Sequence, residues 1–122
     1  MPKGLRPITT YNVYGGTKAI TRNAAHTSQF INLTETAQDG MFSLHWVITG
    51  SANITLTYTV CSISDGTYFT PSGGGTIPNA SALTVTTGGG VTFEPEMYPF
   101  IKLVATENNV AAGTLVLYLN VQ

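Results

Sequence analysis

The sequence predicts an all-β protein of one domain, an antiparallel β-sandwich or barrel, and three observations lead to this. The chain has 122 residues, 43% of them apolar and only 9% charged, so it can bury one core and is too apolar for a disordered chain. It is rich in residues that favour strands and turns, with twenty threonines and 13 glycines. Apolar and polar residues alternate in several segments, and no stretch of ten residues has the spacing of an amphipathic helix.

The clearest predicted strand covers residues 41–49. Every second residue is apolar and should face the core, namely Phe42, Leu44, Trp46 and Ile48. The next strand, residues 53–62, places Ile54, Leu56, Tyr58 and Val60 inside and Thr55, Thr57, Thr59 and Cys61 outside. Gly50 and Ser51 lie between the two segments, so we expect a hairpin there.

Two late segments repeat this alternation. Ile101, Leu103 and Ala105 should face inward before Glu107, and Leu115, Leu117, Leu119 and Val121 should do so near the end of the sequence. Shorter strands are expected at residues 29–34, 67–70, 82–87 and 91–94. About eight short strands separated by Gly, Asp-Gly and Asn-Asn turn signals are typical of a sandwich or a barrel.

The first 25 residues have a different character. They contain two prolines, a Gly-Gly pair and no convincing period, so we predict mainly an extended N-terminal arm at residues 1–25 and the β domain at residues 26–122. A short extended piece of the arm, such as Ile8 to Tyr14, could add to the edge of a sheet. Four of the five basic residues, Lys3, Arg6, Lys18 and Arg22, lie in this segment, which has no acidic residue. The rest of the chain has one lysine and six acids, so the arm is suited to contact an acidic neighbour.

The residues that catalysis would need are scarce. A single cysteine, Cys61, and two histidines, His26 and His45, show neither zinc-ligand spacing nor the company of a nucleophile, and we predict no enzyme activity, metal or cofactor. The two Gly triplets lack the Lys and the helix of a phosphate-binding loop. An acidic body argues against nucleic-acid binding, and no apolar run approaches the ~20 residues that cross a membrane.

The composition therefore predicts that the protein acts through a surface that binds other proteins. Few charges and several exposed aromatic residues are typical of protein interfaces. We predict partner contacts from Lys3, Arg6, Tyr11, Tyr14, Lys18 and Arg22 in the arm and from His45, Tyr68 and Phe69 in the body. The alternative at this point is a carbohydrate-binding β-sandwich in which the aromatic residues stack on sugar rings.

Five segments carry a resemblance to a known class. They are residues 39–50 (DGMFSLHWVITG), 54–58 (ITLTY), 64–69 (SDGTYF), 99–107 (PFIKLVATE) and 115–122 (LVLYLNVQ). Together they resemble small virion structural proteins of tailed bacteriophages, of the capsid decoration or cement type. The resemblance implies a jelly-roll-like sandwich that sits where major capsid subunits meet, as a homo-oligomer such as a dimer or trimer, with no catalytic residues.

On these grounds we expect a single antiparallel β-sandwich, jelly-roll-like, with an N-terminal arm. Its expected place is the capsid surface of a virion, after synthesis in the host cytoplasm, with the major capsid protein or other virion subunits as partners. A tail or neck adaptor of the same fold and a carbohydrate-binding module remain the alternatives.

Overall fold

The fold is a sandwich of two antiparallel β-sheets, described by a computed structural model for residues 7–85 and 89–122. We call the sheets A and B. Sheet A has the order β1-β9-β5-β7 with β2 also paired to β9, and sheet B has the order β3-β8-β4 with β6 also paired to β8. Sheet A contains β1 (Thr9–Asn12), β2 (Lys18–Ile20), β5 (Phe42–Gly50), β7 (Gly89–Phe93) and β9 (Gly113–Val121). Sheet B contains β3 (Ala25–Thr27), β4 (Ile31–Asn32), β6 (Ile54–Cys61) and β8 (Phe100–Glu107).

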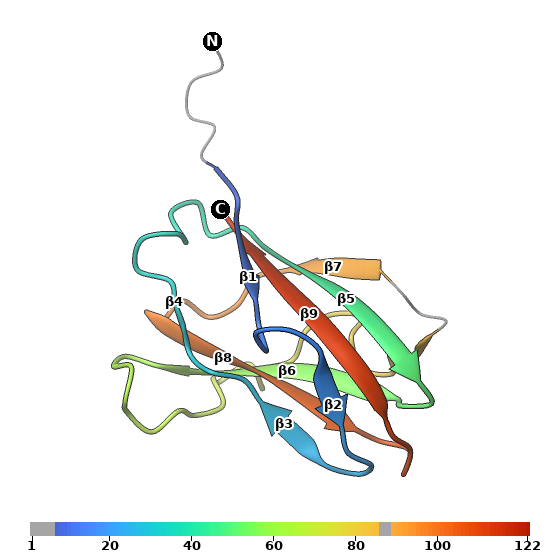
Figure 1. The fold of residues 1–122 in the computed structure, drawn as a ribbon. Helices are drawn as coiled ribbons and strands as arrows, with labels where there is room; N and C mark the ends of the chain where they lie inside the picture. The colour runs from blue at the N-terminus through green and yellow to red at the C-terminus, as the bar shows by residue number, and fades with distance from the viewer. Residues whose placement is uncertain (1–6, 86–88) are drawn as a thin grey trace.

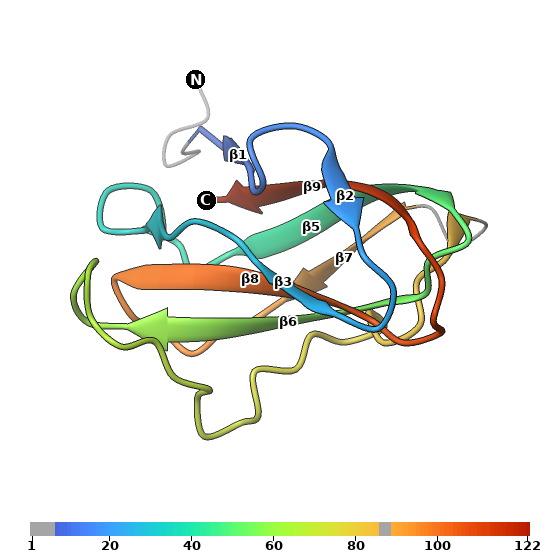
Figure 2. The same ribbon diagram turned by 60° about the horizontal axis from the view of Figure 1, so that its bottom comes forward.

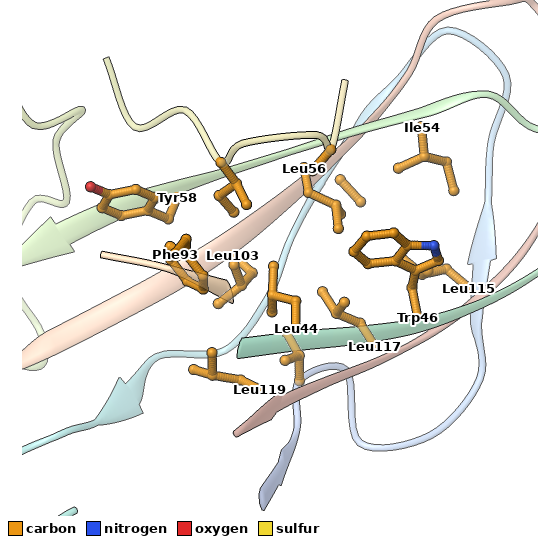
Figure 3. Close-up of a cluster of buried hydrophobic side chains, with 14 of the residues drawn as sticks. Leu44, Trp46, Ile54, Leu56, Tyr58, Phe93, Leu103, Leu115, Leu117 and Leu119 are labelled. Carbon is orange, nitrogen blue, oxygen red and sulfur yellow. The ribbon is translucent and has the colours of Figure 1, made fainter. Parts of the chain in front are cut away.

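The core fills the space between the two sheets. Figure 2 shows them as two layers, with β9 and β5 above β8 and β6. The alternation predicted for the four long strands is confirmed, because the inner residues of β5, β6, β8 and β9 are buried while most of their outer residues stay at least partly exposed. In Figure 3, Trp46 and Leu117 from sheet A face Leu56 and Leu103 from sheet B.

The predicted hairpin at Gly50 and Ser51 is wrong. β5 pairs with β7 and β9 in sheet A, whereas β6 pairs with β8 in sheet B, so residues 51–53 carry the chain from one sheet to the other (Figure 1). Ala52, in the middle of this connection, is fully buried. The alternation of each strand is satisfied equally well by pairing within one sheet and by packing face to face across the core, so the local pattern does not distinguish the two.

The N-terminal segment also differs from the expectation of an extended arm. β1 and β2 both pair with β9 in sheet A, and β3 pairs with β8 in sheet B. Val13 and Ile20 belong to the hydrophobic core. The described part of the segment is therefore built into the sandwich, and the predicted boundary after residue 25 falls inside β3. β1 lies within the piece from Ile8 to Tyr14 that could add to a sheet edge. β2 and β3 have three residues each, which is too short to show a clear period, so the sequence did not indicate them.

The segment between β6 and β7 runs along the free side of β6. Its short strand predicted at residues 67–70 is reduced to one bridge between Phe69 and Val60, and Thr76 and Leu83 make similar bridges to Thr57 and Ile54. The strand predicted at residues 82–87 lies partly outside the described residues. Among the residues that are described, no helix is long and apolar enough to span a membrane.

Candidate interaction surfaces

The few side chains that could act as nucleophiles, acid–base groups or metal ligands lie far apart from one another. In residues 7–85 and 89–122, no three His, Cys, Asp or Glu side chains gather as metal ligands would. Cys61 was predicted on the outside of its strand, but it is buried at the end of β6. His26 accepts a hydrogen bond from the backbone N–H of Thr21 through Nε2 at 3.0 Å, which fixes the connection between β2 and β3. His45 lies apart from both, exposed on β5.

Tyr11 and Tyr14, predicted as partner contacts, link the two sheets instead. The Tyr11 hydroxyl lies 2.9 Å from Oγ1 of Thr36 and 3.2 Å from the Asn32 carbonyl oxygen. The Tyr14 hydroxyl donates to the carbonyl oxygen of His26 at 2.6 Å, and burial raises the pKa of this phenol. Both rings pack against the core. These two residues therefore hold the two sheets of the sandwich together.

The basic residues of the segment divide into two groups. Lys18 is half-buried in β2 and Arg22 is exposed in the connection to β3, so both are accessible from solvent. Lys3 and Arg6 lie outside the described residues. The prediction that these four cations contact an acidic neighbour stays a prediction.

The outer surface of sheet A, which we call face A, bears no charged side chain among its described residues. It consists of Thr10, Asn12, Ala19, Ser43, His45, Val47, Thr49, Thr92, Thr114, Val116, Tyr118 and Asn120. The rings of His45 and Tyr118 stack with centroids 5.5 Å apart and an interplanar angle of 21°. Next to them Val47 pairs with Val116, and the Val47 side chain is 46% exposed.

Five of the polar side chains of face A are hydrogen-bonded to one another. The Thr10 hydroxyl donates to Oδ1 of Asn120 at 2.7 Å, and the Asn120 amide donates to the Ser43 hydroxyl at 3.2 Å. The hydroxyls of Thr49 and Thr114 are also hydrogen-bonded to each other. Each of these bonds joins neighbouring strands of the sheet.

The outer surface of sheet B, which we call face B, is rich in threonine and has one lysine among its described residues. It consists of Ala25, Thr27, Phe30, Asn32, Thr55, Thr57, Thr59, Thr76, Phe100, Lys102, Val104 and Thr106. The register places Val104 between Thr27 and Thr57, and Lys102 beside Thr59. The threonines of β6 are half-buried, so within this chain their row is neither covered nor fully exposed.

One end of face B is aromatic. Phe30, which is 44% exposed, meets Phe100 edge to face with centroids 5.5 Å apart. The ammonium of Lys102 lies 4.2 Å from the centroid of the Tyr68 ring, a cation–π geometry. Phe69 meets Tyr98 in a second edge-to-face pair with centroids 5.3 Å apart. This pair lies at the edge of sheet B toward its inner side, because Phe69 is bridged to the inward Val60 and Tyr98 packs against the core.

The three body residues predicted as contacts therefore do not form one site. Tyr68 and Phe69 lie at the aromatic end of sheet B, whereas His45 is on face A, on the other side of the sandwich. Phe30 and Lys102 are the residues that the sequence prediction missed at this end. Phe30 precedes the inward Ile31, so the alternation around Ile31 was the signal that could have found it.

Glu107 is the other residue that the sequence prediction missed, and its role is internal. Its side chain is 1% exposed and accepts four backbone N–H groups, those of Asn23, Asn53, Asn109 and Ala111, at 2.9–3.1 Å. Burial raises the pKa of this carboxyl, but the four donors together outweigh it and bring the pKa to about 2. The carboxylate joins three connections at one end of the sandwich.

A groove of about 730 Å³ lies at the opposite end of β9. Phe42, Phe93 and Val121 are buried residues in its wall, and Ile8 and Met41 are exposed ones. Glu94 is its one titratable side chain among the described residues. The groove thus combines apolar walls with a single carboxylate.

Comparison with protein-family models and with curated proteins finds no match for this chain.

Proposed function

We propose that this protein is a non-enzymatic structural component of a tailed-phage particle, a decoration or cement protein that binds at joints between major capsid subunits. The observation that carries the proposal is face B, a surface of threonine and aromatic side chains with one charged residue, Lys102. Interface cores are depleted in charge and enriched in aromatic residues. A tail or neck adaptor would use the same surface in a different part of the particle.

The strand order supports a jelly roll as the finer description of the fold. Along the chain, segments alternate between sheets: β1 and β2 in A, β3 and β4 in B, β5 in A, β6 in B, β7 in A, β8 in B and β9 in A. The segment 69–83 adds an irregular fourth position to sheet B beside β6. Four positions in each sheet with this alternation match a double-sheet jelly roll, an architecture that recurs in viral capsid and lectin domains. This support is an analogy of fold.

The partner of face B should carry a carboxylate. Among the described residues of the face Lys102 is the only cation, and it lies over Tyr68, so an acid on the partner would complete a charge pair beside an aromatic contact. Around it, Val104, Phe30 and Phe100 offer apolar area. Many copies on one shell would add these modest contacts together.

The aromatic geometry favours a protein partner over a sugar. Sugar rings stack on aromatic faces that lie open and parallel to them. Apart from His45 and Tyr118, which stack on each other on face A, the exposed aromatic pairs among the described residues have interplanar angles of 87°. In each pair one ring points its edge at the face of the other. We therefore do not propose the carbohydrate-binding function.

The first test is composition of the particle. Particles produced from the genome that encodes this chain should contain it in a fixed ratio to the major capsid protein, measured by quantitative mass spectrometry after gradient purification. Particles that assemble normally and contain none of it would refute the proposal. A fixed but low copy number, six or twelve per particle, would assign it to the tail or neck instead.

The second test locates the contact. Particles that lack the protein are incubated with purified wild type, with Val104→Lys on face B, or with Val110→Lys, which changes an exposed loop residue away from both faces. Val104→Lys should reduce the bound copies at least tenfold, a loss of about 1.4 kcal/mol. Equal binding of Val104→Lys and wild type would show that face B is not the contact.

The basic residues have a testable part in the same proposal. If Lys18 and Arg22 contact an acidic neighbour, raising the salt from about 50 mM to about 500 mM should weaken particle binding, because the Debye length falls below 5 Å. The variant Lys18→Gln with Arg22→Gln should bind less tightly and respond less to salt. Salt-independent binding of wild type would exclude this role.

A further inference from the structure

We infer that face A is the surface by which two copies of this chain associate, in a two-fold symmetric dimer. The inference concerns the second side of the sandwich and does not depend on the particle assignment. It rests on the charge, the internal hydrogen bonding, the apolar centre and the size of face A.

Charge selects face A over face B for self-association. A two-fold contact brings each residue of a face near the same face of the other copy. Two copies of face B would bring two Lys102 ammonium groups into one interface, and no acidic side chain occurs among the described residues of that face. Within its strands face A has no Asp, Glu, Lys or Arg among the described residues, so its centre brings no like charges together. The exposed carboxylate of Glu94 lies just beyond β7, at one end of the face.

The hydrogen bonds within face A lower the cost of removing water from it. Burying a polar group without a partner costs about 1–3 kcal/mol, whereas a group already paired keeps its bond. The chain of bonds from Thr10 through Asn120 to Ser43 and the bond between Thr49 and Thr114 survive when a second sheet covers them. These polar side chains can therefore be buried in an interface without losing their hydrogen bonds.

The centre of face A is its most apolar part. The cross-strand pair of Val47 and Val116 lies beside the stacked rings of His45 and Tyr118, on the two long central strands β5 and β9. Apart from the Tyr118 hydroxyl, the hydroxyl and amide groups of β5 and β9 lie toward the two ends of these strands, at Thr49 with Thr114 and at Ser43 with Asn120. An apolar centre with a polar rim is the arrangement of known interfaces.

The size of face A is sufficient for a weak dimer. β5 and β9 each have nine residues and run side by side through their full length. The strands of sheet A hold 30 residues, nine each in β5 and β9, five in β7, four in β1 and three in β2. At about 3.4 Å per residue and about 4.8 Å per strand, they cover roughly 490 Å². Two copies would bury about 1,000 Å², which suits a weak, concentration-dependent dimer.

Sedimentation velocity on the purified full chain tests this, from about 1 µM to about 500 µM. The variant is Val47→Lys, and its matched control is Val104→Lys, a valine that also sits near the middle of the outer surface of a sheet. We expect a concentration-dependent dimer for wild type and for Val104→Lys. Val47→Lys should raise the dissociation constant at least tenfold, because each copy would place a cation at the centre of the contact.

Two outcomes would overturn the inference. The first is wild type that sediments as a monomer at every concentration, and the second is a dimer that Val104→Lys breaks and Val47→Lys leaves intact. Circular dichroism checks that each variant is folded. If Val47→Lys does not fold, Val116→Lys on the adjacent strand replaces it with the same expected result. Because this assay contains no particles, its outcome is separate from the particle-binding tests of face B.

Discussion

The carboxylate of Glu107 accepts the backbone N–H of Asn53 at 3.0 Å, although 54 residues separate the two in the chain. Asn53 lies in the connection that carries the chain from sheet A to sheet B, and Glu107 ends β8. The same carboxylate accepts N–H groups from the connection between β2 and β3 and from the one between β8 and β9. One buried side chain thus satisfies donors that three connections would otherwise bury unpaired.

Glu107 should make the stability of the fold depend on pH in acid. Its pKa in the folded protein is about 2, below the value of about 4.3 expected in an unfolded chain. The unfolded state therefore binds the proton more readily, so the stabilisation is complete above pH ~4.5 and is lost as the pH falls toward 2. Urea titrations of wild type between pH 2 and pH 7 should show this loss.

The variant Glu107→Gln tests the assignment. It should be less stable than wild type at pH 7, with a difference that shrinks as the pH approaches 2. Glu94→Gln is the control, because Glu94 is an exposed carboxylate at the groove, and its stability curve should follow that of wild type. A Glu107→Gln curve parallel to wild type over the whole range would contradict the role given to the carboxylate.

The N-terminal segment should be required for stability and not only for contact with partners. Ile20 in β2 is 2% exposed, whereas Ile8 in the same segment is 63% exposed. Ile20→Ala should lower the free energy of unfolding by about 2–4 kcal/mol, since it leaves a cavity in the core. Ile8→Ala should change it by less than about 0.5 kcal/mol. Chemical denaturation of the two variants measures both values, and equal small effects would restore the extended-arm interpretation.

Within the first Gly triplet, Gly75 should tolerate substitution less than Gly74. Both have positive φ, +64° and +90°. A Cβ at Gly75 would lie 2.4 Å from the carbonyl oxygen of Tyr58, whereas at Gly74 the nearest atom would be 3.8 Å away. Gly75→Ala should therefore cost about 2–4 kcal/mol and Gly74→Ala about 1–2 kcal/mol, from backbone strain alone. Thermal unfolding of the pair gives the comparison, and a reversed order would show that the segment 69–83 does not pack on β6 as described.

Replacement of Val110 should increase the stability of the fold. It is 62% exposed and has φ of 54°, a left-handed conformation that is costly for a β-branched residue. Its neighbours Asn109 and Ala111 both donate backbone N–H groups to Glu107, which holds the loop in this shape. Val110→Asn should raise the free energy of unfolding by about 1 kcal/mol, because Asn tolerates this region. Val110→Ala should give a smaller gain, and an equal gain would attribute the effect to lost exposed apolar surface.

Much of the local structure could be predicted from the sequence, because alternation at period two is a property of neighbouring residues. The inner residues of β5, β6, β8 and β9 followed from it directly. The same alternation placed Glu107 on the inner side, two residues after Ala105, so the buried carboxylate lay within reach of the sequence argument. The four N–H groups that it accepts could not be predicted from the sequence, since they come from three separate connections.

The candidate contact residues were predictable only in part. Exposed aromatic residues are visible in a sequence, and Tyr68 and Phe69 lie where an aromatic patch forms. That Phe30 and Lys102 join them depends on β4 and β6 both pairing with β8. Tyr11 and Tyr14 show the converse case, because their hydroxyls bind carbonyl groups that only the approach of sheet B brings near.

By itself the sequence determined the class of the fold, the faces of its long strands and the scarcity of charge, since each depends on composition or on adjacent residues. Only the tertiary structure decided that β5 and β6 lie in different sheets, that β1 and β2 complete sheet A, and that His45 lies on the opposite side from Tyr68. The physical reason is that a strand's backbone groups accept any partner strand of suitable register. The choice among partners is made by how all the apolar faces are buried together.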